Sequence, residues 1–246
     1  MIQEIRIKNY LSFRDEVVLS FEATKDTTFE ECQVANVTPK VRLLRFALIY
    51  GANASGKSNL LKAMDFLRDF WFDKKSDIDE ETGVVPFLLD TETPNEPSEF
   101  NIKFFVGDKR YWYALVLDDK QVIKEDLYVY NSVQPSLVFS RELDGTASLI
   151  KLNASLVKAN ATIVEQLNVK CLSNMSFFAA RNQVNCSLAY IDEVRNWMKN
   201  NMMPIIEPGT RMFEYAGKQM EKNAELKAYI LDFVHKADYN ITDVYT

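Results

Sequence analysis

One short run, rich in glycine and small polar residues, constrains the fold more than any other part of this sequence. It comprises Gly51, Ala52, Asn53, Ala54, Ser55, Gly56, Lys57 and Ser58. The run fits the phosphate-binding loop (P-loop) pattern G-x-x-x-x-G-K-[ST] at every fixed position. The apolar residues 43–50 before it predict a strand, and the helical spacing of apolar residues after it predicts a helix. Strand, glycine loop and helix are the context in which this pattern acts as a site.

The residue types in the run match the chemistry of binding phosphate. Backbone N–H groups over residues 53–58 can curl around phosphate oxygens, and the helix that begins near Lys57 adds its positive dipole end. Gly51 and Gly56 allow a close approach that a Cβ would block. Lys57 is expected to reach the β- and γ-phosphates as the catalytic residue, and the Ser58 hydroxyl to ligate Mg²⁺.

Composition narrows the class of protein. The chain has 246 residues and a net charge of −6, which argues against a surface coated with basic groups for nucleic acid. Its three cysteines are widely spaced, and its one histidine, His235, excludes multi-histidine metal sites. The sequence has neither an apolar leader at its start nor an apolar run long enough to cross a membrane. These observations predict a cytoplasmic protein with reduced thiols.

The other hydrophobic patterns predict a mixed α/β fold. Residues 2–21 alternate as a hairpin with a polar turn, and residues 100–143 alternate as a β-meander with turns at Gly107-Asp108 and Asp118-Asp119. From residue 153 onward the apolar spacing is helical. The aromatic residues of the meander are interpreted as sheet packing and not as a platform for stacking bases.

Two stretches carry a resemblance to a known family. The opening IQEIRIKNYLSFRDEVVLSF, followed about thirty residues later by LIYGANASGKSNLLKAM, resembles the RecF/SMC branch of the ABC-type ATPases. The nearest resemblance is to AAA ATPase family 15, a bacterial group often encoded in anti-phage defence and abortive-infection loci. Ala54 stands where that branch usually has a glycine. The resemblance is specific at the P-loop and diffuse over the rest of the chain.

The resemblance implies a P-loop lobe of the ABC/SMC-head type that binds ATP and Mg²⁺. Residues 1–150 would form the ATP-binding lobe, and residues 151–246 a helical insertion that leads toward a second lobe. No Asn-Lys-x-Asp motif for reading guanine occurs. The expected nucleotide-binding residues are the loop itself, the adjacent Asn59, and four residues of the N-terminal turn: Asn9, Ser12, Phe13 and Arg14. For Asn9 and Ser12 the alternative is a capped turn between strands.

An ABC-type ATPase also needs an acidic strand, a signature loop and a switch residue. Residues 188–193 have the letters of an acidic strand, but the helical spacing through Met198 predicts a helix that starts there. Asp118-Asp119 is predicted to be a turn, and residues 172–176 lack the glycines of a signature loop. The expectation is that this chain is the N-terminal part of a longer ATPase.

Three functions remain open at this stage. The first is an ATP-binding lobe whose complete protein pairs two heads around ATP as a switch in a defence or DNA-related system. The second is a non-hydrolysing, nucleotide-regulated scaffold that controls a partner nuclease or toxin. The third is a sensor of DNA ends or damage, which rests on kinship alone and which the acidic balance opposes.

Overall fold

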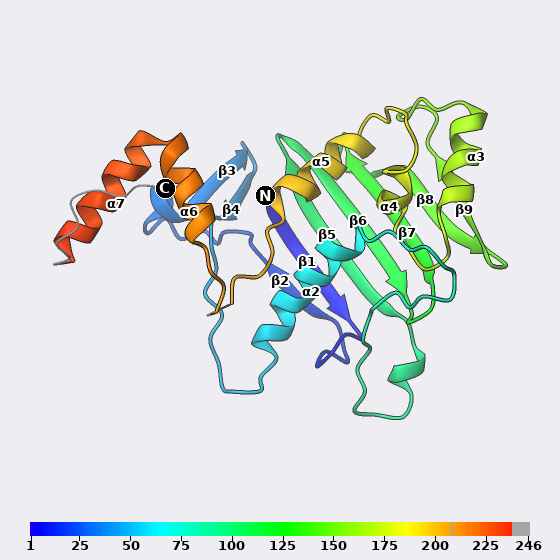
Figure 1. Ribbon diagram of the computed structural model, residues 1–246, viewed down its shortest axis with the longest axis horizontal. Helices are drawn as coiled ribbons and strands as arrows, with labels where there is room; N and C mark the ends of the chain where they lie inside the picture. Colours follow the sequence, from blue (N-terminus) through cyan, green and yellow to red (C-terminus); the bar gives the residue numbers. More distant parts are fainter. Residues whose placement is uncertain (208, 238–246) are drawn as a thin grey trace. The chain divides into compact units, whose positions relative to one another are not determined.

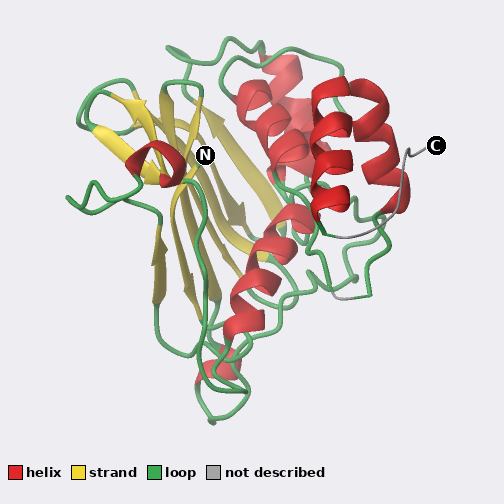
Figure 2. Cartoon of the chain, turned by 90° about the vertical axis from the view of Figure 1, so that its left-hand side faces the viewer, coloured by secondary structure: helices red, strands yellow, loops and turns green. Residues whose placement is uncertain are grey.

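A computed structural model describes residues 1–207 and 209–237 (Figure 1). The chain divides into two compact units, Met1–Pro204 and Ile205–Thr246. In the described part of the first unit, seven antiparallel strands form one sheet in the order β2-β1-β5-β6-β7-β8-β9. The strands lie side by side as a single layer (Figure 2). Their bounds are β1 Ile2–Lys8, β2 Val17–Ser20, β5 Ser98–Val106, β6 Lys109–Leu117, β7 Val122–Tyr130, β8 Ser136–Asp144 and β9 Ala147–Leu152.

The remaining elements of the first unit are short strands and helices. β3 (Val34–Thr38) and β4 (Val41–Leu44) pair as a separate hairpin that follows the short helix α1 (Glu30–Gln33). A 3₁₀ turn, η1, spans Thr93–Asn95. The helices are α2 (Lys57–Phe70), α3 (Ala161–Lys170), α4 (Phe177–Arg181) and α5 (Ile191–Asn201).

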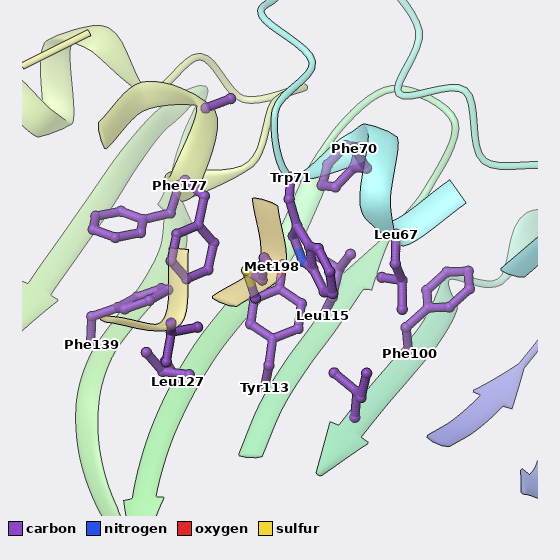
Figure 3. Packing of buried hydrophobic residues seen from close by; sticks show 14 of the residues in the cluster. Leu67, Phe70, Trp71, Phe100, Tyr113, Leu115, Leu127, Phe139, Phe177 and Met198 are labelled. Carbon is purple, nitrogen blue, oxygen red and sulfur yellow. The ribbon is translucent and has the colours of Figure 1, made fainter. Parts of the chain in front are cut away.

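The core lies between one face of the large sheet and the helices that cover it. Alternate residues of β5 and β6 are buried, which is the period-2 pattern of strands with one covered face. Trp71, just after α2, meets Tyr113 of β6 edge-on, with 5.6 Å between ring centroids. Phe177 of α4 packs against Phe139 of β8 (Figure 3), with 4.0 Å between the ring centroids. The P-loop helix is therefore fixed to the sheet by its buried side.

A buried ion pair holds the segment before α4. Arg141 and Glu125 are fully buried and 3.2 Å apart. Arg141 donates to the carbonyls of Leu172, Ser173 and Met175, and Glu125 accepts from the Phe177 amide at 2.8 Å. Each of these buried polar groups has lost its contact with water and bonds to a protein group instead. A satisfied buried network of this kind holds residues 172–176 in a single position.

The second unit contains α6 (Phe213–Lys222) and α7 (Ala224–Lys236). The Asn223 side chain accepts a hydrogen bond from the Leu226 amide and so caps the start of α7.

The structure confirms several expectations from the sequence and corrects one. The hairpin at residues 2–21, the meander and the helix after the P-loop are confirmed. The strand predicted over residues 43–50 is wrong beyond Leu44, because β4 ends there and residues 45–50 pair with no strand in the described chain. The compact units of the chain divide after Pro204, and the expected division at residue 150 into an ATP-binding lobe and a helical insertion stays a prediction. Residues of α3, α4 and α5 belong to the apolar core beside the sheet.

Candidate functional site

The P-loop leads directly into α2. Gly56 adopts a left-handed backbone conformation, with φ of 87°, and immediately precedes the first helical residue, Lys57. A side chain is disfavoured in that conformation, which accounts for glycine at this position. The first turn of α2 carries no acidic residue, so nothing there opposes an anion at the positive end of the helix.

Lys57 folds back across the loop. Its ammonium group donates to the carbonyl oxygens of Gly51, at 2.9 Å, and Ala52, at 2.6 Å. The Ser55 amide also donates to the Ala52 carbonyl, at 3.3 Å. The loop therefore curls around the start of α2, and the Ser58 side chain is exposed beside it. An ammonium, a hydroxyl and free N–H groups at one helix end fit the oxygens of a phosphate and its metal ion.

Ala54 has an unusual backbone conformation. Its φ is 63°, in the left-handed region that costs an L-residue about 1–2 kcal/mol. This is the position where the RecF/SMC branch usually has a glycine, although the nearest resembled family also tolerates alanine. The conformation explains that preference, since glycine adopts positive φ without penalty.

The N-terminal turn lies against the P-loop. Ser12 Oγ accepts a hydrogen bond from Asn59 Nδ2 at 2.8 Å. A Cβ built on Gly56 would lie 2.9 Å from Ser12 Oγ and 3.1 Å from Phe13 Cε1. The structure thus brings Ser12, Phe13 and Asn59 close to the loop, while their predicted contact with nucleotide stays a prediction. Ser12 bonds to Asn59, a contact that neither of the two sequence-based alternatives included.

Asn9 has a different environment. It is fully buried, and its Nδ2 donates to the carbonyls of Thr93 and Glu96 at 2.8 and 2.7 Å. Its Oδ1 accepts from the Phe87 amide at 2.9 Å. These contacts match the structural alternative for Asn9, while its predicted contact with nucleotide stays a prediction. Arg14 is exposed and pairs with Asp15 at 3.1 Å.

Tyr10 supports the site and was missed by sequence reasoning. Its ring is buried between Phe66 and Phe100, and its hydroxyl donates to the carbonyl of Lys62 in α2 at 3.3 Å. Burial of the ring and hydroxyl raises the pKa of Tyr10 to about 12. An aromatic residue inside a polar turn was the available signal.

The residues that lead into the P-loop are uncovered. We call residues 46–50 the approach segment. Its side chains are Phe46, Ala47, Leu48, Ile49 and Tyr50, with Leu48 83% and Tyr50 94% exposed. Within the described chain, no backbone hydrogen bond reaches this segment. An apolar run of this kind is typical of a strand that is buried on both faces.

The acidic pairs that resembled catalytic motifs have structural partners. Asp192 lies in the first turn of α5, where it accepts from the Leu188 amide at 2.8 Å and pairs with Arg181 at 2.8 Å. Glu193 pairs with Lys109 at 2.8 Å and accepts from the Tyr111 hydroxyl. Asp118 accepts from the amides of its own turn. The predicted helix and turn are confirmed at these positions.

The described residues contain neither a cluster of metal ligands nor a helix that could cross a membrane. Over residues 1–207 and 209–237, no group of three or more His, Cys, Asp or Glu side chains is arranged to hold a metal ion. No helix in that part of the chain has the length and apolar character that crossing a membrane requires.

Comparison with known proteins gives one family. A family model described as "AAA domain, putative AbiEii toxin, Type IV TA system" matches residues 46–151. No curated protein matches the chain. The matched segment begins at the approach segment, contains the P-loop and α2, and runs through the meander to β9. The expected kinship with a bacterial P-loop ATPase of the anti-phage type is confirmed over this segment. Residues 46–151 are therefore similar to an AAA-type domain of the P-loop ATPase class, and this similarity implies nucleotide binding.

Proposed function

We propose that this chain is the ATP-binding N-terminal lobe of an ABC/RecF-like ATPase, and that ATP-driven pairing of two heads is the switch of the complete protein. The P-loop backbone over residues 53–58 and Lys57 would hold the phosphates, and Ser58 would ligate Mg²⁺. The name of the matched family suggests a toxin or defence system as the setting.

The observation that carries the proposal is the open start of α2. Gly56, Lys57 and Ser58 combine a left-handed glycine, an ammonium group and an exposed hydroxyl at a helix end without acidic residues. Phosphate oxygens are the ligands that this combination recognises best. A Mg²⁺ ion bound with the nucleotide would neutralise phosphate charge and bridge its oxygens.

The approach segment supports the proposal that a second lobe completes this one. Five consecutive apolar residues whose backbone groups are unpaired form a ready edge for strand addition. A second lobe that supplies neighbouring strands would bury these side chains and hold the first half of the P-loop. That lobe would also supply the acidic strand and the signature loop.

The test is MgATP binding by calorimetry, with phosphate release measured on the same samples. We expect the chain to bind MgATP and release little phosphate, and Lys57→Ala to bind at least tenfold more weakly because a charged hydrogen-bond donor to phosphate is lost. Lys62→Ala is the matched control, since it removes a lysine one turn farther along α2. Equal binding by wild type and Lys57→Ala would refute the proposal.

The alternative is a non-hydrolysing scaffold that uses nucleotide to control a partner nuclease or toxin. It is favoured by the engagement of Asp192 and Glu193 in ion pairs, which leaves neither carboxylate free to orient a water molecule. The same experiment separates the two functions. Phosphate release that depends on Lys57 would exclude the scaffold.

A further inference from the structure

The contacts at the N-terminal turn point to a role that differs from nucleotide binding. We infer that Ser12 and Asn59 are positioning residues: their hydrogen bond braces the first turn of α2 and so holds Lys57 and Ser58 in place. This inference rests on the proposed function, because it names what orients the phosphate-binding groups.

The turn itself is rigid. Tyr10 and Phe13 exchange two backbone hydrogen bonds, at 2.9 and 2.8 Å, and the Leu11 amide donates to the Val85 carbonyl at 2.9 Å. Asn9 fixes the base of the turn through its buried amide. A side chain at the tip of this turn therefore has a defined position relative to the sheet.

The turn contacts α2 at successive positions on one side of the helix. Ser12 Oγ meets Asn59, the Tyr10 hydroxyl meets the carbonyl of Lys62, and the Tyr10 ring meets Phe66 at 5.7 Å between centroids. Positions three and four apart share one face of a helix. The turn therefore runs along the first two turns of α2, next to the residues that would hold phosphate.

The bond between Ser12 and Asn59 also sets the direction of the Asn59 side chain. The Asn59 amide donates to Ser12 Oγ at 2.8 Å, so Asn59 is directed toward the turn. Phe13 fills the space beside the Gly56 backbone, where a Cβ would come within 3.1 Å of its ring. Together these contacts hold the helix end against a fixed wall, and pre-organised groups bind a ligand more tightly than mobile ones.

A double-mutant cycle tests the brace. MgATP affinity is measured for wild type, Ser12→Ala, Asn59→Ala and the double variant. One neutral hydrogen bond corresponds to about a threefold to tenfold loss of affinity in each single variant. Both substitutions remove the same hydrogen bond. The double variant should therefore have about the same MgATP affinity as the single variant that binds MgATP more weakly. If the loss of affinity in the double variant equals the product of the two single losses, Ser12 and Asn59 contact nucleotide independently, and the inference is overturned.

Two control variants sharpen the cycle. Ser12→Thr keeps a hydroxyl at the same position and should restore most of the affinity. Ser20→Ala removes a serine that accepts from the Glu22 amide, away from α2, and should leave affinity unchanged. An unrestored Ser12→Thr, or an equal loss in Ser20→Ala, would contradict the brace.

A second readout does not depend on nucleotide. Amide hydrogen exchange over residues 59–62 is compared between wild type and Ser12→Ala without ATP. The brace predicts faster exchange in Ser12→Ala, because the first turn of α2 loses an anchor. Unchanged exchange would overturn the brace even where wild type binds MgATP. A folded wild type that binds no MgATP would refute the proposed function, while the exchange result would still decide whether the contact braces the helix.

Discussion

The two sides of the P-loop are supported very differently. After the loop, α2 buries Leu67 completely against the sheet and contacts the N-terminal turn through Asn59 and Lys62. Before the loop, the approach segment exposes its apolar side chains and has no backbone partner in the described chain. The same loop therefore joins a fixed helix to an unpaired apolar run.

This difference shows which half of a phosphate site a lobe can prepare alone. Lys57 and Ser58, the groups that we propose to contact phosphate most directly, belong to the supported side. The curvature of the loop before them depends on residues 51–55, which are exposed and follow the unpaired segment. We expect nucleotide binding to begin on the helix side and to tighten when a neighbouring strand covers the approach segment.

The largest expected effect comes from the same substitution on each side. Leu67→Ala should lower the free energy of unfolding by about 2–5 kcal/mol, because it empties a filled position under α2. Leu48→Ala should change it by less than about 0.5 kcal/mol, because that side chain is 83% exposed. Urea denaturation followed by circular dichroism measures both. Similar losses in the two variants would show that the approach segment is packed in solution.

A smaller effect is expected at Gly56, where the loop meets its brace. Gly56→Ala should lower the free energy of unfolding by about 1–3 kcal/mol, through positive-φ strain and contact with Ser12 and Phe13. Gly107→Ala is the matched control. Gly107 also has positive φ, of 60°, but a Cβ there would meet nothing within 4 Å.

The difference between these two glycine variants isolates the contact with the turn. Gly107→Ala should lose only the strain part, about 1 kcal/mol. If the denaturation midpoints of both variants shift equally, the N-terminal turn moves away from the added methyl group without lowering the free energy of unfolding.

The smallest effect is expected at Ala54. Ala54→Gly should raise the free energy of unfolding by up to about 1 kcal/mol, because glycine relieves the left-handed conformation. Ala52→Gly is the control, since Ala52 does not have positive φ and gains nothing except freedom in the unfolded chain. Thermal unfolding should show a rise for the first variant and a fall for the second. A fall in both would place Ala54 in an ordinary conformation in solution.

Local patterns predicted much of the fold. The alternation in β5 to β8, the helix after Gly56 and the helical spacing that rejected Asp192-Glu193 as a strand all depend on neighbours in the sequence. The strand predicted over residues 43–50 failed for the opposite reason. Its apolar pattern indicates burial between neighbouring strands, and no strand of the described chain pairs with it beyond Leu44.

The site was predictable to a similar extent. The P-loop pattern identified Gly56, Lys57 and Ser58, and the resemblance directed attention to Ser12 and Phe13. The partner of Ser12 could not be predicted, because Asn59 is 47 positions away and only the fold brings the two together. Asn9 is buried and Ser12 is exposed, and this difference in burial also depends on tertiary packing.

The pairing of β1 with both β2 and β5 closes a long loop, in the polymer sense, that contains the P-loop. Ile5 lies opposite Ile102, and residues 21–97 connect β2 to β5, the two strands that flank β1. The entropy of closing such a loop grows only with the logarithm of its length, by about 0.6 kcal/mol for each doubling. Extra chain at an exposed point such as Leu88-Leu89 would therefore change the cost of assembling the sheet very little. Evolution, or a protein engineer, has room there to add a further domain.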